Sequence, residues 1–174
     1  DMSGYFVSLQ PVTQLPKLRI LDISDSTAYT DAAALLGIPT LEEFYMNDCH
    51  IGFNINAVPA NAHLHVLNMN NAEIFELADP NYGWLQDSTP IALSEHTDMF
   101  ANFPNLEILS LQGQELDSLS FVEESGLSHL QILDIEDNYV LDLSPLTGLE
   151  ELEYVYCGNN PLADTAGLDD ILIR

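Results

Sequence analysis

The chain has 174 residues, 47% apolar and 18% charged, which is typical of a globular protein with room for one sizeable core. It carries 28 acidic residues against three basic ones, and the resulting net charge of −25 disfavours nucleic acid and anionic lipid and favours basic partners or cations. A general need for solubility or a salty habitat would produce the same charge. No apolar run approaches the roughly 18–20 residues that cross a bilayer, so we expect no membrane insertion.

One eleven-residue frame recurs along the chain and predicts its main secondary structure. Over residues 130–140 it reads Leu-x-x-Leu-x-Ile-x-x-Asn-x-Val, and similar frames begin at 18, 41, 64, 106 and 152, in steps of 23, 23, 42, 24 and 22 residues. Positions 4 and 6 of the frame share one face of a β-strand, whereas position 5 points the other way. We therefore expect Leu133 and Ile135 to be buried and Asp134 to be exposed. Strands this short must stack on their neighbours to bury an apolar face.

The segments around the first frames predict the connections between strands. Residues 5–15 align with 139–149 through a proline and spaced apolar positions, so the chain is expected to begin inside a coil. Residues 30–39 predict one or two helical turns that start at a capping Thr30 and end at Gly37.

The 42-residue step between the third and fourth frames is irregular. Residues 75–90 contain two prolines, one glycine, Tyr82 and the only tryptophan, Trp84, and no strand of the recurring type. They form either a degenerate coil or a loop that leaves the end of the third strand, and we favour the loop. Residues 95–104 then align with 30–39, and 120–126 show the same helical pattern.

The frame resembles the leucine-rich repeat, and the segment NYVLDLSPLTGLEEL at 138–152 resembles the short bacterial repeats of internalin-type surface proteins. The resemblance covers nearly the whole chain. It implies an α/β fold, a right-handed solenoid with a parallel sheet on its concave face and with short helices, 3-10 turns and loops on its convex face.

Position 9 of the frame is expected to satisfy backbone groups inside the stack through a side-chain amide. Only Asn138 and Asn160 keep an asparagine there; the other frames carry Ser26, Cys49, Ala72 and Gln114. The ladder is therefore patchy, and the turns of the early coils are less well determined.

The chain is predicted to be a single domain over residues 1–174, with six clear repeats and one degenerate or looped-out coil within 75–104. Residues 161–174 are expected to enter the return segment of a further coil and to stop there. Because neither end shows an obvious polar cap, which solenoids generally need, we expect a fragment of a longer array.

In the fold that the resemblance implies, positions 3, 5, 7 and 8 form the concave surface. Acids, amides and tyrosines occupy it, with no Lys or Arg, which suits a basic or hydrogen-bonding protein partner. The candidate partner-binding residues are Asp22, Tyr45, Asn68, Asp134, Glu136, Tyr154 and Tyr156, and Tyr154, Tyr156 and Asp134 form the expected hot spot. Trp84 either adds a contact at the rim or packs its own loop. The alternative for every one of these residues is an ordinary solvated strand position.

Catalytic and metal chemistry finds little support. Apart from His63 and His65, the five histidines lie in different coils, and no nucleophile elbow, P-loop or paired metal motif is present. The acids of residues 134–138 lack the glycine and the distal glutamate of an EF-hand loop. We expect no catalytic residue, no cofactor and no metal.

Cys49 and Cys157 are predicted to be free, buried thiols. They lie four or five coils apart, about 19–24 Å at a strand spacing of ~4.8 Å. A disulfide tolerates at most about 7 Å between Cα atoms.

Three functions are compatible with these features. The first is a non-enzymatic protein-binding module of a bacterial surface or secreted protein. The second is a structural spacer array, and the third is a targeting or regulatory segment of an enzyme whose catalytic domain lies outside this chain. We favour the first, with a secreted or cell-surface location; a cytoplasmic location, the oligomeric state and the identity of the partner stay open.

Overall fold

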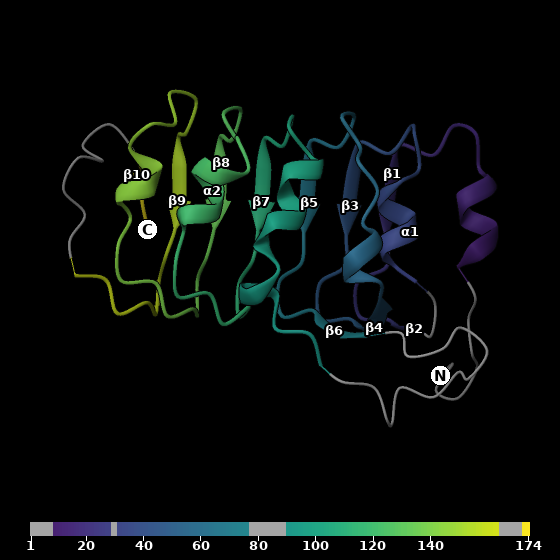
Figure 1. Cartoon of the computed structure of the whole chain (residues 1–174), viewed down its shortest axis with the longest axis horizontal. Helices are drawn as coiled ribbons and strands as arrows, with labels where there is room; N and C mark the ends of the chain where they lie inside the picture. The colour runs from purple at the N-terminus through teal and green to yellow at the C-terminus, as the bar shows by residue number, and fades with distance from the viewer. Residues whose placement is uncertain (1–8, 29–30, 77–89, 164–171) are drawn as a thin grey trace.

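Seven parallel strands form one open sheet, in the order β1-β3-β5-β7-β8-β9-β10 (Figure 1). The computed structural model describes residues 9–28, 31–76, 90–163 and 172–174. The strands are β1 (Ile20–Asp22), β3 (Glu43–Tyr45), β5 (Val66–Asn68), β7 (Ile108–Ser110), β8 (Ile132–Asp134), β9 (Tyr154–Tyr156) and β10 (Leu172–Ile173). The first six occupy positions 3 to 5 of the six frames, which confirms the predicted parallel sheet.

The seventh strand, β10, was not predicted. Leu172 pairs with Tyr154 and Ile173 pairs with Val155, so the end of the chain adds a strand where the sequence indicated only a return segment. Asp170 stands at position 1 of this coil in place of a leucine, and the frame is therefore hard to recognise.

Within the described residues, the irregular step adds no strand to the seven-stranded sheet between the third and fourth frames. Strand β5 pairs directly with β7, with Leu67 opposite Leu109. Trp84 and most of the predicted loop or degenerate coil lie outside the described residues, so that prediction stays open.

A second, three-stranded parallel sheet joins the first three coils. It consists of β2 (Thr27–Ala28), β4 (His50–Phe53) and β6 (Glu73–Glu76), in the order β2-β4-β6 along the lower margin of Figure 1. The frame had indicated only one buried apolar residue in this region of each coil, so this sheet is a finding of the structure.

Short helical segments cover one face of the seven-stranded sheet and leave the other face open (Figure 1). They are η1 (Gln10–Gln14), α1 (Ala33–Leu36), η2 (Ile55–Ala57), η4 (Leu93–Glu95), η5 (Thr97–Asn102), α2 (Ser120–Glu124) and η6 (Ser144–Leu146). None of the described helices is long and apolar enough to cross a membrane. We call the open face of the sheet the concave face.

Helix α1 ends at Gly37 as predicted, but for a different reason. The φ angle of Gly37 is −80°, so it is not a left-handed cap. A Cβ atom at this position would lie 2.8 Å from the ring of Pro59, so glycine is needed for close approach. At the start of the helix, Asp31 Oδ1 accepts the N–H of Ala33 at 3.0 Å, and Thr30 lies outside the described residues.

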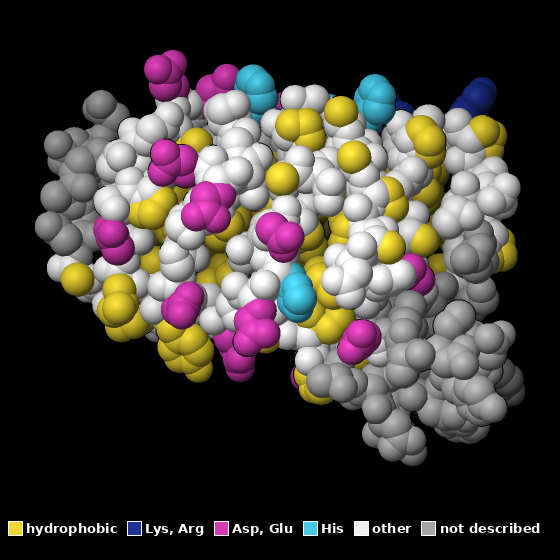
Figure 2. Space-filling model, viewed as in Figure 1, with side chains coloured by type: hydrophobic (Ala, Val, Ile, Leu, Met, Phe, Trp, Pro, Cys, Tyr) yellow, Lys and Arg dark blue, Asp and Glu magenta, His cyan; other side chains and the backbone are white. Residues whose placement is uncertain are grey.

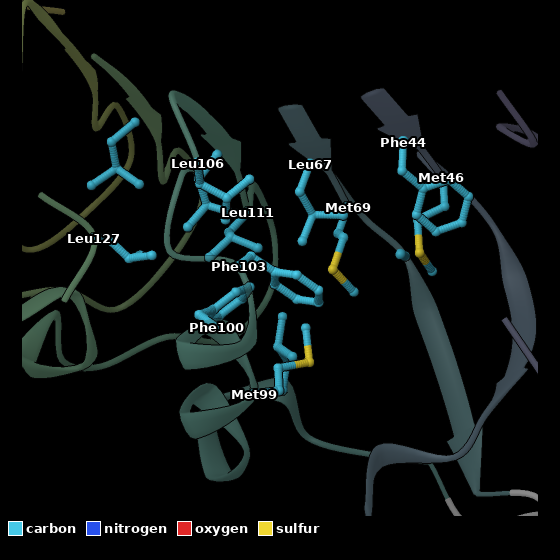
Figure 3. Packing of buried hydrophobic residues seen from close by; sticks show 14 of the residues in the cluster. Phe44, Met46, Leu67, Met69, Met99, Phe100, Phe103, Leu106, Leu111 and Leu127 are labelled. Atoms are coloured by element: carbon cyan, nitrogen blue, oxygen red, sulfur yellow. The ribbon is translucent and has the colours of Figure 1, made fainter. Parts of the chain in front are cut away.

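The core lies between the sheet and these helical segments. Leu133 and Ile135 are fully buried, as predicted. Figure 3 shows Phe44 and Met46 of one coil, and Leu67 and Met69 of the next, pointing to the same side of the sheet. Phe100 and Phe103, which are also fully buried, come from the return segment and lie near Leu111 and Met69.

Position 9 satisfies backbone groups across neighbouring coils, as predicted. The side-chain nitrogens of Asn138 and Asn160 donate to the position-6 carbonyls of the preceding coils, Leu111 at 2.9 Å and Ile135 at 2.7 Å. Gln114 donates in the same way to Met69 O at 2.9 Å.

The asparagine oxygens replace the second sheet in the later coils. Asn138 Oδ1 accepts the N–H of Leu116 at 2.9 Å, and Asn160 Oδ1 accepts that of Val140 at 2.9 Å. Leu116 and Val140 stand at position 11, which in the first three coils lies within β2, β4 and β6. The early coils, which lack an asparagine at position 9, therefore pair their backbones directly.

Candidate functional site

The strand register places equivalent frame positions side by side on the concave face. Column 3 contains Ile20, Glu43, Val66, Ile108, Ile132, Tyr154 and Leu172, and column 5 contains Asp22, Tyr45, Asn68, Ser110, Asp134 and Tyr156. The structure thus aligns six of the candidate residues in two columns. Glu136, the seventh, follows Asp134 by two residues in column 7.

Three polar side chains of column 5 cap the turn that follows their own strand. Asp22 Oδ1 accepts the N–H of Ser24 at 2.9 Å, and this bond holds the pKa of Asp22 below its ordinary value. Asn68 Oδ1 and Asp134 Oδ1 accept the N–H of the residue two positions later, at 3.3 Å and 3.1 Å. These residues therefore have a local structural role, which the sequence reading missed.

Asp134 is half-buried, so the prediction that it is exposed is wrong. Its Oδ2 atom lies 3.3 Å from the side-chain nitrogen of Asn70, which reaches it from the far side of β7. Ser110, which lies between Asn68 and Asp134 in column 5, is 7% exposed. Because both oxygens of Asp134 already accept hydrogen bonds, its carboxylate is less available to a partner than a free acid.

The backbone conformation at position 8 explains why acids are frequent in column 8. Position 8 has a positive φ angle of 51–69° in all six coils, at Asp25, Asp48, Asn71, Gly113, Asp137 and Asn159. Asp, Asn and Gly are the residue types that adopt this left-handed conformation most readily. Asp137 also accepts hydrogen bonds from Gln112 Nε2 at 2.6 Å and Asn159 Nδ2 at 2.7 Å, which lower its pKa. Much of the concave acidity thus has a structural cause.

The three candidate tyrosines differ in how far their hydroxyl groups are engaged. Tyr45 donates to Glu43 Oε2 at 2.8 Å, and burial followed by the nearby Glu43 raises the pKa of Tyr45 to about 12. The hydroxyls of Tyr154 and Tyr156 make no hydrogen bond within the described part of the chain, and both side chains are half-buried. Among the described residues of the concave face, these two tyrosines have hydroxyls that are available to a partner.

Glu136 lies against Gly158, which follows Tyr156 by two residues. A Cβ atom on Gly158 would be 3.0 Å from Glu136 Oε1, so the carboxylate lies close to the glycine backbone of the next coil. No described residue donates a hydrogen bond to that carboxylate. Among the candidate acids near the expected hot spot, the half-buried Glu136 is therefore the one whose carboxylate keeps unused hydrogen-bonding capacity within the described chain.

The expectation that the concave face lacks basic residues is wrong, because Arg174 lies on it. Its N–H donates to Val155 O and its carbonyl accepts the N–H of Cys157, both at 2.9 Å. These bonds place Arg174 alongside Tyr156, at the end of column 5.

Column 3 forms an aliphatic stripe that the sequence reading did not single out. Val66, Ile108 and Ile132 are half-buried and adjacent, and the stripe continues through Tyr154 to Leu172, which is 51% exposed. An apolar centre with polar flanks is the usual arrangement of a protein interface.

Ion pairs between neighbouring coils line the amino-terminal edge of the strands. Arg19 donates to Glu42 through two nitrogens, at 2.7 Å and 2.5 Å, which raises the pKa of Arg19 and lowers that of Glu42. His129 Nδ1 lies 3.2 Å from Glu151. Lys and Arg colour Figure 2 only at its upper right margin, whereas acids are scattered over the face shown.

The cysteines are free and buried, as predicted. Cys49 Sγ donates to Ile23 O at 2.9 Å, the position-6 carbonyl that an asparagine would serve elsewhere. Burial raises the pKa of both thiols. No group of three His, Cys, Asp or Glu side chains in the described ranges is arranged to hold a metal ion.

Comparisons with known proteins give structural matches. No protein-family model and no curated protein matches the sequence. Internalin C2 of Listeria monocytogenes matches with a TM-score of 0.62 at 18% identity, over 99% of this chain and 76% of that one. Internalin F of the same organism matches with a TM-score of 0.50 at 18% identity, over 95% and 56%.

A leucine-rich-repeat protein of Leptospira interrogans is also similar, with a TM-score of 0.52 at 17% identity, over 87% of this chain and 40% of that one. This chain therefore spans about half the length of the second and third matches and three quarters of the first. At these identities the likeness concerns the fold, and it agrees with the parallel sheet and short helical returns seen here. The chain has an internalin-like leucine-rich-repeat fold.

Proposed function

We propose that the chain is a non-enzymatic protein-binding module that engages its partner through the concave face. The observation that carries the proposal is the cluster around Tyr154 and Tyr156, whose half-buried rings are adjacent on one strand and whose hydroxyls are free within the described chain. Tyrosine is enriched among interface residues that contribute most to binding. Glu136 supplies an acid next to Gly158, two residues after Tyr156, and Ile132, which pairs with Tyr154, supplies an apolar neighbour.

The partner in this proposal is a protein with a basic surface, and the location is extracellular or on a bacterial cell surface. The net charge of −25 supports a basic protein and disfavours nucleic acid. The proteins of similar fold include two internalins and a Leptospira protein, which supports a bacterial setting. Asp22, Tyr45 and Asn68 extend the proposed surface along column 5. Asp134 belongs to the surface too, and it holds the turn that carries Glu136.

A spacer array is the second candidate, and one observation favours it. The acids of columns 5 and 8 include several that hold their own turns, such as Asp22 and Asp137. A spacer would need these residues for folding alone.

The test compares binding by a concave variant and a matched control. A partner is first captured from the proteins of the organism's surroundings, and its affinity is measured by biolayer interferometry. The variant is Tyr154→Ala, Tyr156→Ala and Glu136→Gln, and the control is Tyr139→Ala, which removes a tyrosine that is 61% exposed outside columns 3, 5, 7 and 8. We expect the variant to lose at least about tenfold in affinity and the control to keep the parent value.

Two results would contradict the proposal. The first is a folded triple variant that binds the partner as tightly as the parent. The second is a partner whose binding is lost in the Tyr139→Ala control, because the interface would then lie elsewhere. Circular dichroism and urea melts establish that each variant is folded.

A further inference from the structure

We propose that the partner presents a side-chain amide, from Asn or Gln, that hydrogen-bonds Gly158 N–H and the Glu136 carboxylate together. The amide oxygen accepts from Gly158, and the amide nitrogen donates to Glu136. This inference rests on the proposed function and adds the chemistry that the partner brings to the concave face near Tyr156.

The backbone N–H at position 7 is capped within the fold in each of the first five coils. One kind of cap comes from column 5 of the same coil, and it is made by Asp22, Asn68 and Asp134. The other kind comes from column 7 of the preceding coil. There the N–H groups of Asn47, Asn70 and Gln112 donate to Ser24 Oγ, Asn47 Oδ1 and Asn70 Oδ1, at 3.2, 3.1 and 2.8 Å. Neither kind of cap needs a following coil.

The sixth coil lacks both caps. Tyr156 occupies column 5 and makes no such bond, and Glu136, the column-7 residue of the preceding coil, accepts no hydrogen bond from the described chain. Gly158 N–H therefore has no acceptor among the described residues. Glu136 Oε1 is nevertheless close, since it lies 3.0 Å from where a Cβ atom on Gly158 would be. An unused donor and an unused charged acceptor thus lie side by side.

The hydrogen-bonding needs of these two groups select the ligand. Gly158 N–H needs an acceptor, and the Glu136 carboxylate needs a donor. Lys and Arg side chains have no acceptor, and an ionised carboxylate has no donor, so none of them satisfies both groups. A side-chain amide offers a donor and an acceptor on separate atoms of one planar group, whereas a hydroxyl must make both bonds through one oxygen. The amide is therefore the side chain that complements the pair.

The surroundings of the pair agree with a neutral ligand. Arg174 lies alongside Tyr156 and makes no ion pair within the described chain, so it disfavours a cation at this place. Glu136 and Asp134 disfavour an anion there. The net charge of −25 still attracts a basic protein at long range, while hydrogen bonds at short range decide which residue of that protein fits.

The experiment selects random peptides displayed on phage against the intact chain, with counter-selection against the Tyr154→Ala, Tyr156→Ala variant. The retained peptides therefore need the tyrosines of the proposed binding surface. We expect them to share an Asn or Gln. Its replacement by Asp, Leu or Lys in a synthetic peptide should lower the affinity at least about tenfold, as measured by fluorescence anisotropy.

Matched variants of the chain then locate the amide. Glu136→Ala should lower the affinity for the same peptide at least about tenfold, whereas Glu136→Gln, which keeps an acceptor oxygen, should retain more of it. Gly158→Ala should also weaken binding, because its methyl group would displace the carboxylate. The controls are Glu124→Ala on α2, which is exposed, and Gly148→Ala, where an added Cβ meets no atom within 4 Å. Both controls should match the parent.

A double-mutant cycle tests the direct contact. The losses from Glu136→Ala and from replacing the peptide's amide by Leu should be smaller together than their sum, because both remove the same hydrogen bond. Strictly additive losses would overturn the inference. Circular dichroism and urea melts establish that each variant is folded.

The outcomes separate this inference from the proposed function. Peptides that need the tyrosines but tolerate replacement of every Asn and Gln would overturn the amide and leave the proposed function standing. The same holds for peptides whose essential residue is Lys, Arg, Ser or Thr, and for peptides whose affinity survives both Glu136→Ala and Gly158→Ala. A selection that retains no tyrosine-dependent peptide would also overturn the inference, while the captured natural partner would still test the function.

Discussion

The side-chain nitrogen of Asn70 lies 3.3 Å from Asp134 Oδ2, although the two residues are 64 positions apart and strand β7 lies between their coils. Ser110 of β7, which pairs with Asp134, is 7% exposed. One hydrogen bond therefore ties together coils that are not nearest neighbours, and it fixes the carboxylate that the sequence had offered as a binding group.

A double-mutant cycle measures this contact. Asn70→Ala and Asp134→Ala should each destabilise the fold, because each residue makes further hydrogen bonds, to Gln112 N and Glu136 N respectively. The coupling energy between them should be about 0.5–1.5 kcal/mol, the net contribution of one hydrogen bond. Urea unfolding of the parent, the two single variants and the double variant gives the value. Strictly additive losses would show that the contact contributes nothing.

The buried strand face should respond much more strongly to truncation. Leu133→Ala should lower the free energy of unfolding by about 2–5 kcal/mol, since it leaves a cavity in a packed core. Leu141→Ala, at a 55% exposed leucine, should stay within about 0.5 kcal/mol of the parent. Thermal or urea melts that gave both variants the same loss would contradict the assigned core.

Asn138 joins two coils through a buried amide that is 2% exposed. Its side chain accepts from Gln114 N and Leu116 N and donates to Leu111 O, Ile135 O and Glu136 O. Asn138→Ala should cost roughly 3 kcal/mol or more, because several buried backbone groups lose their partners at about 1–3 kcal/mol each.

Hydrogen exchange supplies a second measurement on the same variant. The amides of Gln114 and Leu116 should lose protection in Asn138→Ala before the rest of the sheet does. Asn56→Ala, at an exposed residue of η2, serves as the control and should change stability by less than about 0.5 kcal/mol. Equal stability of Asn138→Ala and the control would refute the structural role of the amide.

Substitutions at three glycines should distinguish the cost of a left-handed backbone from the cost of a steric clash. Gly113 has a φ of +69°, and a Cβ atom there would lie 2.4 Å from Asn71 Oδ1; Gly126 has a φ of +67° with no atom within 4 Å. Gly148 has neither feature. Substitution by Ala should cost about 1–2 kcal/mol at Gly126 through the backbone alone, more at Gly113, and little at Gly148. The order of the three melting temperatures is the test, and a Gly148 variant as unstable as the Gly113 variant would contradict it.

Acid should remove part of the stability through Asp137. Hydrogen bonds from Gln112 and Asn159 lower the pKa of Asp137 below its ordinary value in the folded chain. The ionised form therefore stabilises the fold at neutral pH, and this contribution is lost as the pH falls below about 4 and through the lowered pKa. Asp137→Asn should give a shallower fall of stability with acid than the parent over that range. Glu124→Gln controls for the loss of one charge, and identical pH profiles for the parent and the Asp137 variant would contradict the linkage.

The repeating frame predicted six of the seven strands because burial on a strand has a period of two, and the steps between frames are nearly constant. Leu133 and Ile135 follow that period directly. Strand β10 was not predicted because its frame begins with Asp170 in place of a leucine. The position of Arg174 beside Tyr156 was missed as a direct result.

The sequence predicted which residues share the concave face, but it did not predict which of their side chains are already hydrogen-bonded within the fold. Columns follow from register, so Tyr156 beside Asp134 was foreseeable. The engagement of Asp134 with Asn70 depends on side-chain geometry across an intervening strand, which no local pattern encodes. Column 8 did carry a signal, since every one of its six residues is Asp, Asn or Gly, the types that tolerate a positive φ.

Gln114 has a consequence for how the coils can be exchanged. Its nitrogen reaches Met69 O and Ala72 O of an early coil, while its own N–H is bound by Asn138 of a late one. The array therefore contains two kinds of junction, one made by backbone pairing and one made by asparagine, with Gln114 as the adapter between them. We therefore expect that a graft joining a coil of one kind to a coil of the other needs a long side-chain amide at position 9 to satisfy the backbone groups on both sides.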